Sequence, residues 1–308
     1  MNFKNRSIIS IREMSRRDID YIINSAERLQ DNWQNYSDCL KDKILGNLFF
    51  EPSTRTRISF ETAMKRLGGR VVGFSAPEGS SLAKGENLID TVRVVENYCD
   101  AIVLRHPLEG AARLAANYVS IPVINAGTGA EEHPTQALLD LYTISKEKGG
   151  IDGLNIALLG DLKYGRTIHS LTYGLSNYKV KITLVAPPLM KLREEIMEDL
   201  KSKGIELREA TNLEDVISEV DVLYVTRIQR ERFADPTEYE RVKGSYHIDL
   251  KTLNNAKKDL IIMHPLPRLE EISTEVDATK HAVYFKQVKY GLIIRMTILL
   301  LIFGFELK

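Results

Sequence analysis

Short apolar runs alternate with amphipathic stretches along most of the sequence. Continuous apolar runs are typical of parallel β-strands that are covered on both faces. The stretches between the runs carry apolar residues at helical spacing, as at Phe60, Met64 and Leu67, so the pattern predicts βαβ units. The predicted strands are Ile44 to Phe50, Arg70 to Phe74, Ala101 to Leu104, Pro122 to Asn125, Asn155 to Leu159, Lys181 to Val185, Val222 to Val225 and Leu260 to Met263.

A Gly-rich and charged stretch at residues 147–153 is the best candidate for a domain boundary, because a predicted strand begins directly after it. The chain has 308 residues, and at roughly 150 residues per domain this length favours two domains. We therefore expect an α/β protein with domains at 1–147 and 151–287, each a mostly parallel sheet flanked by helices.

The segment 288–308 contains the most apolar part of the chain, from Gly291 to Phe305. Arg295 interrupts this run and leaves only a short uncharged stretch, whereas a membrane-spanning helix needs about 20 apolar residues. The sequence therefore predicts a buried C-terminal helix that packs back on the first domain, and no membrane partner.

Composition excludes several classes of protein. Lys plus Arg equals Asp plus Glu at 42 each, and a general nucleic-acid binder usually has a basic excess. Cys39 and Cys99 are the only cysteines, so no disulfide framework or cysteine metal site is expected. The stretch from Met1 to Arg12 lacks the apolar core of a signal peptide. We expect a cytoplasmic protein with reduced thiols and no nucleic-acid partner.

The segment from Phe49 to Arg57 is the strongest candidate for a binding site. A predicted strand ends at Phe50 and a helix begins near Ser53 or Thr54, either of which is a good N-cap. The free N–H groups of a first helical turn bind phosphate, and nearby hydroxyls and arginines strengthen such a site. The simpler alternative is an ordinary capped helix with solvated arginines. The complete string at a strand-to-helix junction favours an anion site.

Other polar residues also follow predicted strands. Arg105 ends one strand, and ligand sites of open α/β sheets gather at such ends. His133 and Gln136 are about one helical turn apart, so both can face one ligand. Arg166 and Arg227 follow two strands of the second half, and the planar guanidinium of arginine binds a carboxylate at two points. Surface ion pairs and a structural histidine are the simpler alternatives, but two such arginines in one domain favour a dicarboxylate pocket.

Five motifs occur in the order typical of one family, and together they cover essentially the whole chain. The chain resembles the aspartate/ornithine carbamoyltransferase family, and its last motif resembles the aspartate branch. Each motif alone is weak, but five in register are highly specific. The motifs are Ser53 to Arg57 with Ser59 to Glu61, Ser80 to Glu86, Arg105 to Pro107, His133 to Asp140, and His264 to Arg268.

The resemblance implies an enzyme that transfers the carbamoyl group of carbamoyl phosphate to the amino group of L-aspartate. The products would be N-carbamoyl-L-aspartate and phosphate, an early step of de novo pyrimidine biosynthesis. No metal or other cofactor is expected. The implied catalytic residues are Arg55, Thr56, Arg105, His133 and Lys84.

The resemblance also divides the binding residues between the two substrates. Carbamoyl phosphate would contact Ser53, Thr54, Arg55, Thr56, Arg105, His133, Gln136 and the backbone carbonyls of Leu266 and Pro267. Aspartate would contact Lys84, Arg166, Arg227 and Gln229. Glu51 would bridge to Arg166 and Arg232 and so favour closure of the two domains.

The family forms homotrimers with shared active sites, in which Lys84 would reach into the site of a neighbouring subunit. Some members also assemble with a zinc-containing, nucleotide-binding regulatory chain into a dodecamer. Lys163, Tyr164, Glu238 and Tyr239 resemble residues that link subunits in such assemblies. The sequence leaves open whether this chain has a regulatory partner.

One departure from the family pattern lies in the segment that resembles its mobile loop. Many members have two adjacent lysines there, whereas here Ala83 precedes Lys84. Since Lys84 is retained, the functional prediction stands. The alignment within the loop leaves Ser80 and Ser81 as alternatives for one active-site serine.

Three alternatives remain to be weighed. An ornithine carbamoyltransferase would need a cysteine-containing loop in place of His264 to Pro267, but no cysteine follows Cys99. A non-catalytic binding protein of the same fold is expected to have lost an anion-binding residue, and none is missing. A Rossmann-type nucleotide binder is disfavoured, because the spacing from Gly160 to Gly165 does not fit the dinucleotide-binding pattern.

Overall fold

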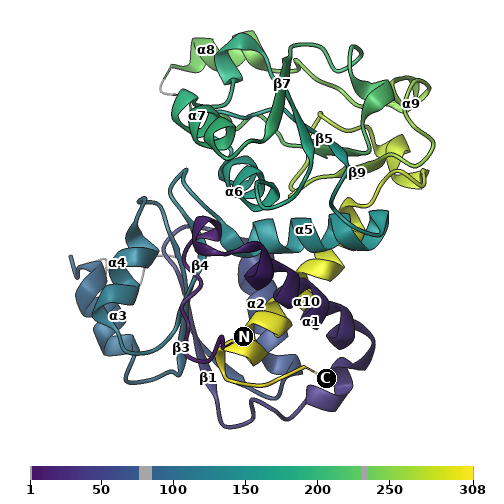
Figure 1. Ribbon diagram of the computed structural model, residues 1–308. Coiled ribbons are helices and arrows are strands. Elements are labelled where there is room, and N and C mark those ends of the chain that lie inside the picture. Colours follow the sequence, from purple (N-terminus) through teal and green to yellow (C-terminus); the bar gives the residue numbers. More distant parts are fainter. Residues whose placement is uncertain (1, 76–84, 231–232, 234, 308) are drawn as a thin grey trace. The chain divides into compact units, whose positions relative to one another are not determined.

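The structure is a computed structural model that describes residues 2–75, 85–230, 233 and 235–307 (Figure 1). The chain forms two compact units. Unit 1 comprises Met1–Tyr142 and Lys289–Lys308, and unit 2 comprises Thr143–Val288. The domain boundary expected at residues 147–153 remains a prediction.

Unit 1 is built on a parallel sheet with the strand order β2-β1-β3-β4. Helices α1, α2 and α10 lie on one face of this sheet, and α3 and α4 lie on the other (Figure 1). The elements are α1 (Arg16–Asn32), β1 (Ile44–Phe49), α2 (Thr54–Arg66), β2 (Arg70–Phe74), α3 (Leu88–Val95), β3 (Ala101–His106), α4 (Ala111–Tyr118) and β4 (Val123–Thr128), most of α5 (Pro134–Lys148) and of α10 (Tyr284–Ile302), and the 3-10 helices Ile11–Glu13 and Trp33–Tyr36.

The sheet of unit 1 is stabilised by apolar packing against its helices. On the α3 and α4 face, Leu48, Ile102 and Leu104 pack with Val92 and Ala115, and all five side chains are buried. Removing each such side chain from water contributes about 1 to 3 kcal/mol. Burial of these side chains in the core stabilises the predicted apolar runs as strands.

Helix α10 packs back on unit 1, as the sequence predicts. Its Arg295 Nη1 donates to Ser59 Oγ of α2 at 2.9 Å. Its Tyr290 ring lies 5.4 Å from the ring of Tyr142 in α5, in an edge-to-face arrangement. A helix that is apolar on all sides is typically buried. In the described part of the chain, no helix has both the length and the hydrophobicity that crossing a membrane requires.

Unit 2 is a second parallel sheet, with the strand order β7-β6-β5-β8-β9. Helices α6 and α7 lie together on one side of it (Figure 1). The elements are β5 (Asn155–Leu159), α6 (Arg166–Leu175), β6 (Lys181–Val185), α7 (Glu194–Ser202), β7 (Glu206–Ala210), β8 (Val222–Val225), α8 (Pro236–Val242), α9 (Leu250–Leu253) and β9 (Ile261–Met263), with the 3-10 helices Pro188–Met190, Ile217–Glu219 and Thr274–Ala278.

The α/β class and the two parallel sheets are confirmed, and all eight predicted strands are present with small shifts at their ends. Strand β7 was not predicted, because an edge strand needs no continuous apolar run and Glu206, Arg208 and Glu209 give it a polar sequence. Strand β2 is also an edge strand and is largely exposed, so the expectation of burial on both faces was wrong there. Edge strands carry polar residues because one side of them meets water.

Candidate active site

The order of strands in unit 1 creates a point where the connections reverse direction. Strand β1 lies between β2 and β3, so the chain moves outward from β1 to β2 and then returns to form β3. Right-handed crossovers then place α2 and α3 on opposite faces, so the carboxyl ends of β1 and β3 form the switch point of this sheet. Ligands of open α/β sheets bind at such a switch point.

The loop after β1 leads into the first turn of α2 at this switch point. Ser53 is the N-cap residue of α2, with an extended backbone, and its side chain accepts no capping hydrogen bond from a backbone N–H of the described residues. Thr56 in the first turn is buried, whereas Thr54 and Arg55 are exposed. Because an N-cap hydroxyl that is not used for capping remains available to a ligand, this turn fits the predicted phosphate site.

Arg105 lies beside this loop, at the carboxyl end of β3. Arg105 pairs with Phe49 in the β1–β3 ladder, and the Arg105 carbonyl accepts a hydrogen bond from the N–H of Phe50 at 2.8 Å. The guanidinium forms an ion pair with Glu51 at 2.7 Å and donates to the carbonyl of Ala126 at 3.1 Å. Two neighbouring strands and the β1–α2 loop therefore fix the position of this cation.

His106 follows Arg105, and its ring packs against Phe50 in the loop after β1. Its ring centroid lies 4.8 Å from that of Phe50, and its Nδ1 accepts from the N–H of Leu108 at 3.0 Å. Burial lowers the pKa of His106, while the charge of Glu51 opposes that shift. The imidazole is therefore neutral at pH 7 and serves to hold the loop in place.

His133 directly precedes α5 and Gln136 lies in the first turn of that helix, which follows β4, the neighbour of β3 in the sheet. Both side chains are buried. The preceding residue, Glu132, accepts from Ser10 Oγ at 2.6 Å and from the N–H of Ile11 at 2.8 Å, which anchors the segment. The amide Nε2 of Gln136 donates to Asp140 Oδ1 at 2.9 Å. Three adjacent strands of unit 1 thus lead into the segments that carry Ser53 to Thr56, Arg105, His133 and Gln136, at one edge of the sheet.

Unit 2 also has a switch point, although its strand order is different. Strands β5, β6 and β7 follow one another outward, and the chain then returns to place β8 on the other side of β5. The switch point therefore lies between β5 and β8, and the loops that carry Arg166 and Arg227 leave the sheet there. Arg166 is the first residue of α6, and Arg227 follows β8 directly after Thr226.

Asp161 joins these two loops. Its buried carboxylate accepts from the N–H of Tyr164 at 2.9 Å and from the N–H of Gln229 at 3.4 Å. Its own N–H donates to Thr226 Oγ1 at 3.1 Å. Gly160 makes this approach possible, because a Cβ there would lie 2.1 Å from the carbonyl oxygen of Thr226 and its φ is +113°. Arg166 and Arg227 therefore belong to one connected loop pair.

The loop after β9 is held by a side-chain network. His264 Nδ1 accepts from the N–H of Leu266 at 2.8 Å, and His264 Nε2 contacts Glu271 at 2.8 Å. Leu266 has φ +55° and precedes a cis peptide bond to Pro267. A left-handed conformation is disfavoured for leucine and is most often kept at functional sites.

Comparison with known protein families gives two matches that together span most of the chain. Residues 6–146 match the carbamoyl-P binding domain of aspartate/ornithine carbamoyltransferase, and residues 152–302 match the Asp/Orn binding domain. The chain belongs to the aspartate/ornithine carbamoyltransferase family.

Relatives within this family are similar over nearly their full length. The aspartate carbamoyltransferase catalytic subunit of Archaeoglobus fulgidus is 60% identical over 96% of this chain and 98% of the relative. The catalytic subunit of M. jannaschii aspartate transcarbamoylase is 52% identical, with a TM-score of 0.88 and coverage of 96% of each chain. The Trypanosoma cruzi aspartate transcarbamoylase in complex with carbamoyl phosphate and aspartate is 43% identical, with a TM-score of 0.90 and coverage of 96% and 95%.

The residues expected from the family resemblance divide between the two units. Unit 1 brings together Ser53, Thr54, Arg55, Thr56, Arg105, His133 and Gln136, together with Glu51. Unit 2 carries Arg166, Arg227, Gln229, Leu266 and Pro267. Lys84, Arg232, Ser80 and Ser81 lie outside the described residues. The individual roles of all these residues in a carbamoyltransferase remain predictions.

Three residues that hold the site were not assigned a role from the sequence. Asp140, Asp161 and Glu271 are carboxylates that anchor Gln136, the Arg227 loop and His264, respectively. For Asp140 a signal was present, because it lies four residues after Gln136 on the same helix. Asp161 and Glu271 bind across loops, so spacing alone could not reveal their partners.

A group of aromatic rings in unit 2 contains two of the expected subunit-linking residues. The ring of Phe233 lies 5.9 Å from that of Tyr164 and 5.7 Å from that of Tyr239. The ammonium of Lys163 lies 5.1 Å from the Tyr164 ring centroid. Phe233 thus connects the two segments, and their part in subunit assembly remains a prediction.

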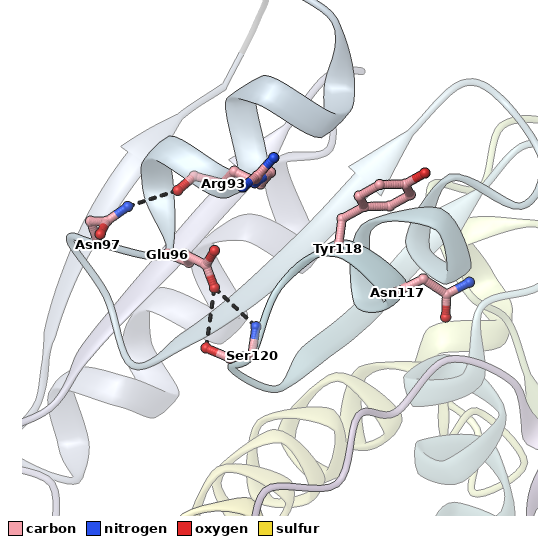
Figure 2. A pocket seen from close by; sticks show the side chains of 6 residues that line it. All are labelled: Arg93, Glu96, Asn97, Asn117, Tyr118 and Ser120. Atoms are coloured by element: carbon pink, nitrogen blue, oxygen red, sulfur yellow. Dashed lines mark hydrogen bonds between the residues drawn. The ribbon is translucent and has the colours of Figure 1, made fainter.

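A surface hollow at the ends of α3 and α4 contains none of the predicted site residues. It is lined by Arg93, Glu96, Asn97, Asn117, Tyr118 and Ser120 (Figure 2). Glu96 accepts from the N–H of Ser120 at 2.9 Å and from its Oγ at 3.2 Å (Figure 2). Ser120 precedes β4, so the hollow lies at the amino-terminal edge of the sheet, away from the switch point.

Proposed function

We propose that this protein transfers the carbamoyl group of carbamoyl phosphate to the amino group of L-aspartate, which gives N-carbamoyl-L-aspartate and phosphate. The observation that carries the proposal is that each parallel sheet gathers cations at its own switch point, with hydroxyl groups beside those of unit 1. The Trypanosoma cruzi relative in complex with both substrates supports the same reaction. The product feeds de novo pyrimidine biosynthesis, and the reaction takes place in the cytoplasm.

Carbamoyl phosphate binds on unit 1. The phosphate lies at the first turn of α2, where Ser53, Thr54 and Arg55 contact it. Thr56, Arg105 and His133 stabilise the negative charge that builds on the carbonyl oxygen as the amine attacks. Preset donors of this kind often supply the largest part of a rate enhancement. The arginines also neutralise the departing phosphate, which could itself accept the proton of the amine.

Aspartate binds through its two carboxylates on unit 2. Arg166 at the start of α6 receives the α-carboxylate, and Arg227 receives the side-chain carboxylate with support from Gln229. Bidentate pairs suit both positions because the guanidinium presents parallel N–H donors. Ornithine has no second carboxylate for Arg227, so aspartate is the better fit.

Glu51 controls domain closure in this proposal. Its carboxylate pairs with Arg105 in the structure, and a phosphate that binds Arg105 competes with it. Glu51 then becomes available to bridge to Arg166 and Arg232, which favours the closed state. Bringing the two substrates together in this way lowers the entropic part of the barrier.

The protein is proposed to act as a homotrimer in which Lys84 completes the site of a neighbouring subunit. Mixing two inactive variants, Lys84→Ala and Arg55→Ala, tests this sharing. In the mixed trimers, some active sites take Arg55 from one variant and Lys84 from the other, and these sites carry neither substitution. Equal mixing and reassembly should restore roughly a quarter of the activity. If the mixture stays inactive although trimers form, the shared site is excluded.

The reaction itself is tested by measuring carbamoylation of aspartate, with ornithine as the competing acceptor. We expect product with aspartate and at least about a hundredfold less with ornithine, because an unpaired arginine in the site is penalised. The variant Arg55→Ala should lower kcat/KM by about a hundredfold or more, because charged hydrogen bonds to the phosphate are lost.

A matched control lies on the same helix. Arg57 forms an ion pair with Glu61 at 3.3 Å, four residues further along α2, so Arg57→Ala should keep kcat/KM within about threefold. Equal losses in the two variants would show that the helix, rather than its first-turn arginine, matters. Carbamoylation of ornithine in preference to aspartate would overturn the proposed function.

A further inference from the structure

The loop after β5 is also held on the side of the sheet that lies away from β8. Strand β6 is the neighbour of β5 on that side, and the segment that follows β6 bonds to the loop twice. The N–H of Leu162 donates to the carbonyl of Met190 at 3.2 Å. Arg193 Nε donates to the carbonyl of Lys163 at 3.1 Å. The loop that leads to Arg166 is therefore held by the segments after both neighbouring strands.

The bond from Arg193 holds one end of a single peptide group. The carbonyl of Lys163 and the N–H of Tyr164 belong to the same planar peptide and point in opposite directions. Arg193 binds the carbonyl, and Asp161 Oδ1 accepts from the N–H at 2.9 Å. Arginine only donates hydrogen bonds and an ionised carboxylate only accepts them, so neither bond can form if the peptide turns over. The two side chains together therefore favour one orientation of this peptide.

This peptide lies almost directly before the residue that starts α6. Only Gly165 separates Tyr164 from Arg166, the first residue of the helix. Glycine has the widest choice of backbone conformations, and as the N-cap residue Gly165 has no side chain that could cap the helix. A Cβ at Gly165 would lie 2.3 Å from the carbonyl oxygen of Asp161, so the chain turns back closely here. The position of Arg166 therefore depends on the peptide that precedes the glycine.

A surface ion pair is the simpler explanation for Arg193. Its Nη1 lies 3.8 Å from Glu195 Oε1, and the Glu195 side chain is 74% exposed. An ion pair with so exposed a carboxylate contributes little to stability. The Arg193 side chain is only 31% exposed, and its contact with the Lys163 carbonyl is the shorter one. The observations favour an arginine that supports the loop after β5.

We propose that Arg193 is a positioning residue of the aspartate site. By holding the Lys163 carbonyl, it keeps the peptide between Lys163 and Tyr164 in the orientation that fixes the first turn of α6 and the guanidinium of Arg166. The inference rests on the proposed function, in which Arg166 receives the α-carboxylate of aspartate. It gives the segment after β6 a task in substrate binding.

The test compares two uncharged replacements that differ in whether they keep a donor. The Nε2 of glutamine is as many bonds from Cα as the Nε of arginine, whereas methionine has a methyl group there. Arg193→Met should raise the KM for aspartate about tenfold, since the Lys163 carbonyl loses its donor. Arg193→Gln should stay within about threefold of the unaltered protein. Equal rises in the two variants would overturn the inference, because the donor would then not matter.

The other kinetic constants separate positioning from a general loss of structure. Because Arg166 is proposed to bind aspartate equally in the ground state and the transition state, Arg193→Met should leave kcat within about twofold. The KM for carbamoyl phosphate should also stay within about twofold, because that ligand is proposed to bind unit 1. Comparable changes in all three constants would contradict a positioning role.

Two control variants address the ion pair and the loss of a surface arginine. Glu195→Gln removes the ion pair with Arg193 but leaves the bond to Lys163, so the KM for aspartate should not change. Arg208→Met removes another arginine of unit 2, which pairs with Glu219 at 3.1 Å, and should likewise leave this KM unchanged. A rise in either control as large as that of Arg193→Met would overturn the inference.

A double-mutant test ties the effect to Arg166. The ratio kcat/KM for aspartate can be measured well below saturation, so it remains accessible in variants that bind weakly. In an Arg166→Ala background, Arg193→Met should lower this ratio by less than about twofold, because the group that it positions is gone. In an Arg227→Ala background, which retains Arg166, the loss should remain about tenfold. Equal losses in the two backgrounds would exclude an action through Arg166.

Failure of this inference is distinguishable from failure of the proposed function. If the unaltered protein does not carbamoylate aspartate, the proposed function fails and the inference fails with it. If the unaltered protein does so but Arg193→Met leaves the KM for aspartate unchanged, only the role of Arg193 is wrong.

Discussion

The two units hold the residues at their switch points in place by different kinds of hydrogen bond. In unit 1, side chains hold other side chains: Glu51 pairs with Arg105, and Asp140 binds Gln136. In unit 2, side chains hold backbone: Asp161 accepts from the N–H groups of Tyr164 and Gln229.

The difference fits the two proposed ligands. Unit 1 must place several separate groups around a compact phosphate and a carbamoyl group, so each side chain needs its own support. Unit 2 must set the spacing between two arginines that bind the two ends of a dicarboxylate. Because that spacing depends on the path of two loops, anchoring their backbone is the effective means. Substitution of a supporting carboxylate in unit 1 should alter one ligand contact. Substitution of the supporting carboxylate in unit 2 should displace a whole loop.

The largest effect is expected where the two loops of unit 2 approach most closely. Gly160→Ala would force a Cβ to within 2.1 Å of the Thr226 carbonyl oxygen, and we expect it to lower the free energy of unfolding by about 3 kcal/mol or more. Gly153 also has a positive φ, but its Cβ would have open space, so Gly153→Ala should cost only about 1 kcal/mol. Denaturant unfolding of both variants measures the difference. Equal losses would show that the close approach is unimportant.

The second-largest effect is expected for Asp161→Ala, in the KM for aspartate. Asp161→Ala leaves two backbone N–H groups without their acceptor, and we expect the KM for aspartate to rise by about a hundredfold. The affinity for carbamoyl phosphate should change by less than about threefold, because that ligand is proposed to bind unit 1. Steady-state kinetics with each substrate varied in turn will measure both. A comparable loss for carbamoyl phosphate would contradict the separation of the two sites.

A smaller and different effect is expected for Glu51→Ala. The loss of its pairing with Arg105 and of the proposed closing bridge should lower kcat by about tenfold. Binding of carbamoyl phosphate should weaken by less than about threefold, since Arg105 keeps its bond to the Ala126 carbonyl. Turnover and phosphate inhibition report the two quantities separately. Unaffected turnover would remove Glu51 from the mechanism.

The smallest effect concerns the pH dependence of stability in unit 2. Burial raises the pKa of Glu271, but the hydrogen bond with His264 and two backbone bonds outweigh it, so its folded pKa lies below the ordinary value of 4.5. Stability from this group is complete above 4.5 and is lost as the pH falls through the folded pKa.

Glu271→Gln removes this contribution, so its Tm should lie about 2 to 4 °C below that of the unaltered protein at pH 7. The gap should shrink as the pH falls below 4.5. The exposed neighbour Glu270→Gln serves as the control and should show no gap. A gap that stays constant with pH would mean that the carboxylate charge plays no part.

The sequence by itself determined the class of fold and predicted where the site lies along the chain. Buried parallel strands require continuous apolar runs, so the runs of seven buried strands and the short β2 run were visible, while the polar edge strand β7 was not. Ser53 to Thr56 and Arg105 could be proposed because they follow strands in the sequence, whereas the role of Gln136 came from the family resemblance.

Only the tertiary structure decided which side chains support the site. Asp161 reaches a loop that lies more than sixty residues away in the sequence, and Glu132, which precedes His133, accepts from Ser10 more than a hundred residues away. The strand order decides these encounters, since it brings β8 next to β5 and leaves the carboxyl ends of β1, β3 and β4 at one edge. Periodicity along a chain records which residues are buried, but not which buried residues meet.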